Sequence, residues 1–156
     1  MPLPRTLLVD DDDIVRRVLE IHLSRQDSVE IVGSVATGEE AILAAEHLKP
    51  DLIILDFSLP GLSGMDTMRF IIKSLSRVRI VVLSAKQSRE QVQQAFDAGA
   101  AGYVSKAASG TDLLEAVRAV IAGHQYASPA LCCHLTSPGR VHIQLPGTLS
   151  ADSSAF

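Results

Sequence analysis

Five short, mainly apolar runs of β-type residues alternate along this chain with segments of helical period, and no other feature restricts the fold as strongly. The runs span residues 6–9, 29–35, 52–55, 80–83 and 102–105. A strand that is apolar on both sides belongs to a sheet covered on both faces, and helical crossovers join parallel strands. The sequence therefore predicts a five-stranded, doubly wound parallel sheet of the α/β class with helices on both faces.

Local signals at the expected helix ends agree with this fold. Thr37 with Glu40 and Ser88 with Gln91 have the spacing of a capping box, which predicts a helix start at each place. Gly99 stands where a helix C-terminus favours a left-handed residue. These signals predict helices that begin near residues 38 and 89, the second of them ending before Gly99.

The composition of the chain changes after Gly123. A length of 156 residues accommodates one domain of roughly 100 to 150 residues and a short appendage. The last part carries only Arg140 and Asp152 as charged side chains, with several prolines, glycines and serines. We expect a folded domain over residues 1–123 and a linker or tail over 124–156, without a complete output domain.

Charge and hydropathy restrict the function classes. The formal net charge of −4 gives no basic field for a nucleic-acid backbone, so we expect no direct DNA binding by this chain. No apolar run approaches the ~20 residues of a membrane span, and the N-terminus has no signal-peptide pattern. The adjacent Cys132 and Cys133 build no disulfide framework. These features predict a cytoplasmic protein with no membrane association.

Polar residues follow four of the predicted strands. Asp10 and Asp11 follow the first strand, Asp56 the third, Ser84 the fourth and Lys106 the fifth. In a doubly wound sheet the ligand crevice lies at the carboxyl ends of the strands, where strand order reverses. We therefore expect these five side chains to meet in one crevice.

Three carboxylates in one crevice repel one another unless a cation or protons neutralise them. Oxygen ligands with room for water and a phosphate are the set that Mg²⁺ prefers. Lys106 supplies a positive charge and Ser84 a hydroxyl donor, which are the groups needed to hold phosphoryl oxygens. Asp56 is then the candidate nucleophile, because a carboxylate can form an acyl phosphate.

Four segments that contain these residues, 8–11, 51–64, 81–85 and 98–106, resemble in order the signature blocks of receiver domains of two-component response regulators. The resemblance covers about residues 5–123 and implies a flavodoxin-like strand order 2-1-3-4-5. It implies that Asp56 is the phosphoacceptor and a Mg²⁺ ligand. Asp11 would bind Mg²⁺ directly, Asp10 largely through water, and Ser58 through its backbone carbonyl.

The same resemblance assigns the signalling residues. Ser84 corresponds to the hydroxyl residue that moves to the phosphoryl group, Lys106 to the phosphoryl-binding lysine and Tyr103 to the aromatic switch residue. The phosphoryl donor would be a sensor histidine kinase or a phosphotransfer protein. The change would reach a face formed by the fourth helix, fifth strand and fifth helix, where a homodimer is an expected outcome.

Within receivers, the sequence is most similar to the NarL/FixJ type. Ala107 follows the lysine, where many receivers have proline, and residues 120–129 also resemble that group. NarL/FixJ regulators continue into a helix-turn-helix, whereas residues 135–140 only resemble its start. The sequence leaves two possibilities: a fragment of a transcriptional regulator, or a receiver that acts without its own DNA-binding output.

Three other readings are weighed against a signalling receiver. A haloacid-dehalogenase-like phosphatase also uses a phosphorylated aspartate, but it needs an aspartate two residues further on, where this chain has Ser58. An adaptor independent of phosphorylation would not need the acidic and lysine set. A zinc site at Cys132, Cys133, His134 and His142 lacks the usual ligand spacing. We therefore expect a signalling module and not an enzyme.

Overall fold

The computed structural model describes residues 2–85, 88–107 and 110–128. Strands and helices alternate along this part of the chain, as the sequence predicts. The strands are β1 (Arg5–Val9), β2 (Glu30–Val35), β3 (Leu52–Asp56), β4 (Arg79–Ser84), β5 (Gly102–Ser105) and β6 (Tyr126–Ala127). The helices are α1 (Asp13–Arg25), α2 (Gly38–Leu48), α3 (Gly64–Ser74), α4 (Arg89–Asp97) and α5 (Gly110–Ile121).

All strand pairs are parallel, and the order across the sheet is β2-β1-β3-β4-β5-β6. The predicted α/β class and the order of the first five strands are confirmed. The structure adds to the five predicted strands a sixth strand of two residues, β6, beside β5. Its two residues pair with Gly102 and Tyr103. A strand this short has no periodicity of its own, so only its long-range pairing defines it.

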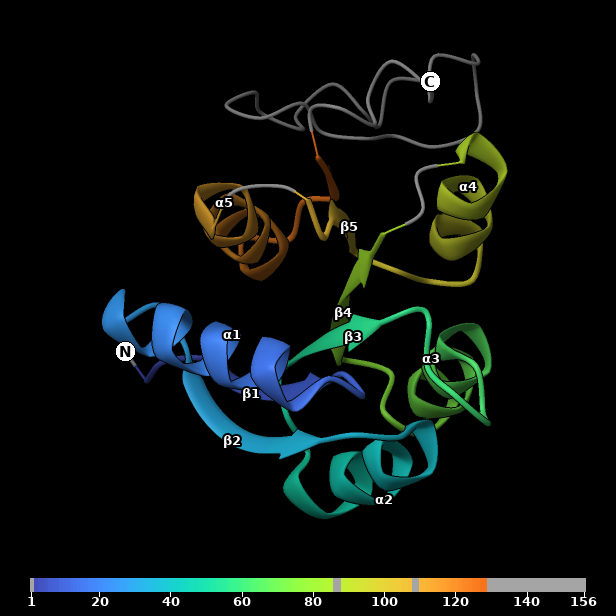
Figure 1. The fold of residues 1–156 in the computed structure, drawn as a ribbon, viewed down its shortest axis with the longest axis horizontal. Helices are drawn as coiled ribbons and strands as arrows, with labels where there is room; N and C mark the ends of the chain where they lie inside the picture. The colour runs from blue at the N-terminus through green and yellow to red at the C-terminus, as the bar shows by residue number, and fades with distance from the viewer. Residues whose placement is uncertain (1, 86–87, 108–109, 129–156) are drawn as a thin grey trace.

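Helices cover both faces of the sheet: α1 and α5 lie on one side, and α2, α3 and α4 on the other (Figure 1). Successive residues of a strand point to opposite faces. Leu7 and Ile53 therefore pack in the core below α2 and α3, whereas their neighbours Leu8 and Ile54 pack in the core with α5. This two-sided burial explains why the strands read as continuously apolar in the sequence.

The predicted helix ends are confirmed. The Thr37 hydroxyl accepts a hydrogen bond from the Glu40 amide at 3.1 Å, and Ser88 caps α4 through the Gln91 amide at 3.1 Å. Gly99 has φ +115°, a conformation that disfavours residues with a Cβ atom. No helix in the described ranges is long and apolar enough to cross a membrane.

The segment after α5 is ordered further than the sequence suggests. The amides of Tyr126 and Ser128 donate to the carbonyls of Ala101 (3.1 Å) and Tyr103 (3.0 Å), and all three residues from Tyr126 to Ser128 are buried. The expected boundary between residues 123 and 124 stays a prediction. Residues 129–156, which include the zinc-ligand candidates Cys132, Cys133, His134 and His142, lie outside the described residues.

Candidate functional site

The predicted site residues come to one edge of the sheet. Asp10 follows β1 directly, Asp56 is the last residue of β3, Ser84 is the last residue of β4, and Lys106 follows β5. Because all these strands are parallel, their carboxyl ends share one edge, and the crossing from β1 to β3 is the place where strand order reverses. The sequence prediction of a common crevice is therefore met by the backbone alone.

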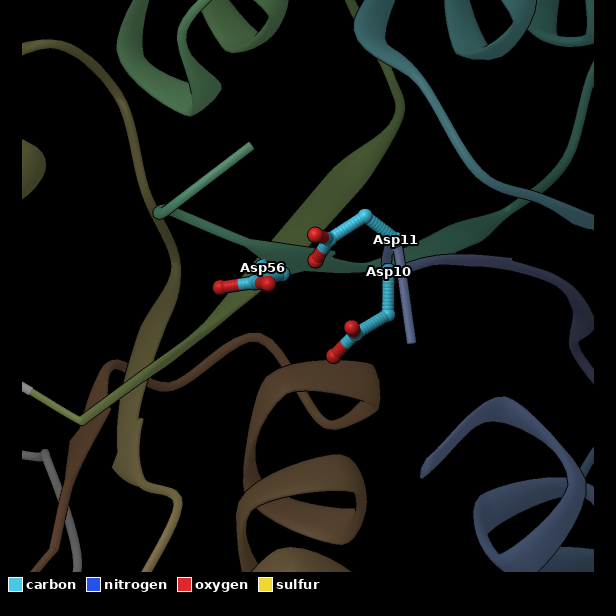
Figure 2. A group of neighbouring side chains, drawn as sticks. All are labelled: Asp10, Asp11 and Asp56. Atoms are coloured by element: carbon cyan, nitrogen blue, oxygen red, sulfur yellow. The ribbon is translucent and has the colours of Figure 1, made fainter. Parts of the chain in front are cut away.

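Three carboxylates form the centre of this crevice. Asp10, Asp11 and Asp56 each contribute one oxygen to a group whose members all lie within 4.8 Å of one another. Figure 2 shows the Asp10 and Asp11 side chains, which leave the end of β1, beside that of Asp56. Asp10 and Asp56 are each 1% exposed, whereas Asp11 is exposed. Because Asp11 is exposed beside the two buried carboxylates, solvent and a ligand can reach the site from the Asp11 side.

Lys106 bridges the two buried carboxylates. Its Nζ lies 3.0 Å from Asp10 Oδ2 and 3.0 Å from Asp56 Oδ2. Burial by itself lowers the pKa of Lys106, but the interactions with Asp56 and Asp10 outweigh burial and the net shift is upward. Lys106 is therefore fully charged at neutral pH. One ammonium against three carboxylates still leaves a negative excess in the crevice.

Asp10 carries the clearest sign of unmet charge. Burial raises its pKa most, and repulsion by Asp56 adds to the increase, against hydrogen bonds from Asp12 and Lys106 that lower it. Its Oδ1 accepts the Asp12 amide at 2.9 Å. Its Oδ2 is buried and pairs with the Lys106 ammonium at 3.0 Å. A hard divalent cation fits this set of carboxylate oxygens, because such cations prefer oxygen ligands and the positive charge would offset the buried carboxylates.

The loops around the acids are fixed by their own backbone. The Ser58 amide donates to Asp56 Oδ1 at 2.9 Å, so one Asp56 oxygen is held by the loop while the other faces Lys106. Asp12 caps α1, accepting the amide of Ile14 at 2.9 Å. The role expected of the Ser58 carbonyl stays a prediction.

The two expected switch residues touch each other. Tyr103 is fully buried, and its side chain is hydrogen-bonded to that of Ser84. Burial raises the Tyr103 pKa, and the Ser84 hydrogen bond opposes that rise. The Tyr103 ring also meets the Phe57 ring edge to face, with centroids 6.1 Å apart and planes at 83°. Tyr103 therefore contacts Ser84 on β4 and the residue that follows Asp56.

Two residues that support the site received no role from the sequence. Gly64 begins α3 against the end of β3, and a Cβ there would lie 2.6 Å from Phe57 Cα and 2.8 Å from the Asp56 carbonyl oxygen. Arg16 donates to the Asp10 carbonyl oxygen at 2.5 Å and to the Ser34 hydroxyl at 2.9 Å. Gly64 lies within a recognised block, so its position was available as a signal, whereas Arg16 had none.

Comparison with known proteins gives the family. The family model of the response regulator receiver domain matches residues 6–118 of this chain. The response regulator GacA of Pseudomonas viridiflava is 34% identical over 131 residues, which cover 84% of this chain and 61% of GacA. The transcriptional activator protein ExaE of Pseudomonas putida is 40% identical over 129 residues, covering 83% of this chain and 60% of ExaE. A crystal structure of a LuxR-family two-component response regulator from Aurantimonas sp. SI85-9A1 is similar with a TM-score of 0.81 and 31% identity, covering 85% of this chain and 95% of that one.

The chain therefore belongs to the response regulator receiver domain family, whose members are signalling proteins and not enzymes. Within the family it is similar to receivers of the NarL/LuxR type. Receiver domains generally bind Mg²⁺ at an acidic pocket, and in this chain Asp10, Asp11 and Asp56 form an acidic cluster. The chain spans about three fifths of the length of the GacA and ExaE proteins that it matches.

Proposed function

We propose that this chain receives a phosphoryl group on Asp56 from a phosphohistidine of a sensor histidine kinase or phosphotransfer protein. An Asp56 carboxylate oxygen attacks phosphorus, the P–N bond to the donor imidazole breaks, and that nitrogen keeps the bonding electrons. The observation that carries the proposal is the bridging of Asp56 and Asp10 by Lys106, at 3.0 Å from each. This arrangement keeps a cation beside a buried candidate nucleophile.

Asp10, Asp11, Asp56 and the Ser58 carbonyl would hold Mg²⁺ in this proposal, with water as further ligands. When bound, Mg²⁺ would neutralise the carboxylates and the charge on the transferring phosphoryl oxygens. Lys106 supplies the second positive charge to those oxygens. The amide of Ser58 keeps one Asp56 oxygen in place, so the other is the oxygen that attacks.

Ser84 and Tyr103 would carry the signal away from the site. A phosphoryl group adds about −1.5 to −2 charges and strong acceptor oxygens. The Ser84 hydroxyl is a donor for those oxygens, and a move toward them breaks its hydrogen bond with Tyr103. The altered face of α4, β5 and α5 would then bind a second copy or an output partner. Because ExaE is a transcriptional activator, we propose that the output is transcriptional control. With a net charge of −4, this chain would not bind DNA itself, and we expect it in the cytoplasm.

The test is phosphorylation by acetyl phosphate with Mg²⁺, followed by intact mass. Wild type is expected to gain one phosphoryl group and Asp56→Asn none, because an amide cannot form the acyl phosphate. Asp66→Asn is the matched control, since Asp66 is an exposed aspartate on α3. A phosphoryl adduct retained by Asp56→Asn would place the acceptor elsewhere, and an unmodified wild type would favour a phosphorylation-independent adaptor.

A further inference from the structure

The chain after α5 is attached to β5 by a buried polar cluster. The Ser128 hydroxyl accepts a hydrogen bond from the Ser105 amide at 3.0 Å and donates to Asp112 Oδ2 at 2.6 Å. The Tyr126 hydroxyl donates to the other Asp112 oxygen. Ser128 is 1% exposed and Asp112 8% exposed. A carboxylate from α5 thus fixes two hydroxyls of the segment that follows it.

This cluster ends one residue away from Lys106. Ser105, whose amide the Ser128 hydroxyl holds, immediately precedes Lys106, and the Ser105 hydroxyl accepts the Ala107 amide at 3.2 Å. The Lys106 amide itself donates to the Ser84 carbonyl at 2.9 Å. Two successive amides at the end of β5 are therefore hydrogen-bonded: that of Ser105 to Ser128 and that of Lys106 to β4.

We propose that Ser128 and Asp112 are positioning residues for Lys106, so that the segment after α5 takes part in phosphoryl transfer. The inference rests on the proposed function of Asp56 and Lys106, and it adds Ser128, which lies beyond the expected end of the receiver at residue 123. Neither Ser128 nor Asp112 touches a reacting atom. They act through the Ser105 amide, which sets where the Lys106 side chain leaves β5.

The physical reason is the cost of burying a charge. A buried carboxylate is unfavourable unless hydrogen bonds compensate it, and hydrogen bonds to a charged group are stronger than those between neutral groups. Asp112 therefore stabilises the arrangement in which both Tyr126 and Ser128 are docked. When Ser128 is docked, its hydroxyl holds the Ser105 amide in one orientation and so fixes the backbone next to Lys106. Misplacement of a reacting group by about 1 Å can lower the rate up to 10²-fold.

The experiment compares Ser128→Ala, Asp112→Asn and Thr6→Ala in the full chain, at a temperature where circular dichroism shows each to be folded. Thr6→Ala is the matched control, because it removes a buried hydroxyl that donates to the Pro4 carbonyl at the opposite edge of the sheet. The readouts are the rate constant for phosphorylation by acetyl phosphate, the Mg²⁺ affinity, and hydrogen exchange of the Ser105 amide.

We expect Ser128→Ala to slow phosphorylation roughly tenfold, with Mg²⁺ affinity changed by less than about threefold, because Lys106 is not a metal ligand. The Ser105 amide should exchange faster in the same variant. Ser128→Thr, which restores a hydroxyl, should regain rate, and Asp112→Asn should slow the reaction less than Ser128→Ala. Thr6→Ala should match wild type in both rate and Mg²⁺ affinity.

A wild-type rate in Ser128→Ala, together with faster Ser105 exchange, would overturn the inference and leave the proposed function of Asp56 intact. Equal slowing by Thr6→Ala would show that loss of stability, and not positioning, sets the rate, and would overturn it as well. If Ser128→Ala does not fold, Asp112→Asn decides by the same readouts. A wild-type chain that accepts no phosphoryl group would overturn both proposals.

Discussion

Replacing Asp56 by asparagine should leave the metal-free protein as stable as wild type or more stable. Asp56 Oδ2 lies 3.0 Å from Lys106 Nζ, which at an effective dielectric constant of about 20 corresponds to about 5.5 kcal/mol of attraction. Repulsion by Asp10, within 4.8 Å, corresponds to at least about 3.5 kcal/mol on the same scale. The exposed Asp11 adds to the repulsion, and burial of the Asp56 charge costs several kcal/mol more.

These opposing contributions favour the neutral side chain. Asparagine keeps an oxygen for the Ser58 amide, and Lys106 keeps Asp10 as its partner. We expect the free energy of unfolding of Asp56→Asn in EDTA at pH 7 to lie between that of wild type and about 2 kcal/mol above it. For a domain of this size, that is a rise in Tm of up to roughly 8 °C.

Mg²⁺ should lower the unfolding free energy of Asp56→Asn relative to that of wild type. At a concentration ten times its dissociation constant, a ligand of the native state stabilises wild type by about 1.4 kcal/mol, and the variant, with one carboxylate fewer, should gain less. Thermal unfolding of both proteins in EDTA and in Mg²⁺ measures this, with Asp66→Asn as the exposed control. A loss of more than about 2 kcal/mol by Asp56→Asn in EDTA would show that the Lys106 ion pair outweighs the repulsion, and would refute the reasoning.

Three further outcomes follow from the structure. Asp11→Ala should abolish the saturable Mg²⁺-dependent NMR shifts of the crevice, and unchanged titration would exclude Asp11 as a ligand. Burial raises the pKa of both tyrosines of the chain, Tyr103 and Tyr126, so an alkaline absorbance titration should show no phenolate near pH 10 while the protein is folded. The free energy of unfolding should fall as pH rises above 10, because the tyrosines ionise there in the unfolded chain but not in the folded one. Gly64→Ala should cost about 2 kcal/mol in denaturant unfolding, because its Cβ would meet the β3 backbone; a neutral result would show that α3 can shift.

The sequence was sufficient for the parts of this fold that repeat a simple period. Strands buried on both faces are apolar throughout, and parallel strands bring their carboxyl ends to one edge, so the meeting of Asp10, Asp56 and Lys106 follows from chain order and strand direction. The Thr37 and Ser88 caps could be predicted because a cap is a local hydrogen bond between residues three apart.

The parts that could not be predicted depend on contacts between distant residues. β6 has two residues and exists only through its pairing with β5. Asp112 lies in a helix where an acidic residue near the first turn is ordinary, and only the structure brings it to Tyr126 and Ser128. Composition led us to expect a linker from residue 124, because a short polar segment looks the same in sequence whether or not a buried carboxylate holds it.

Lys106 combines features that local sequence predicts with contacts between distant residues. Its charge and its place after β5 are local features, but its ammonium must stay 3.0 Å from two carboxylates on two other strands. A lysine side chain has about 2 kcal/mol of rotamer entropy to lose, and a compact ammonium has no planar fork to direct it. Attraction to Asp10 and Asp56 holds the end of the side chain, while the Lys106 amide donates to the Ser84 carbonyl and the amide of the preceding Ser105 donates to Ser128. In the proposed phosphoryl transfer, the Lys106 ammonium would exchange a carboxylate partner for the phosphoryl group, and a fixed backbone would keep the ammonium within reach.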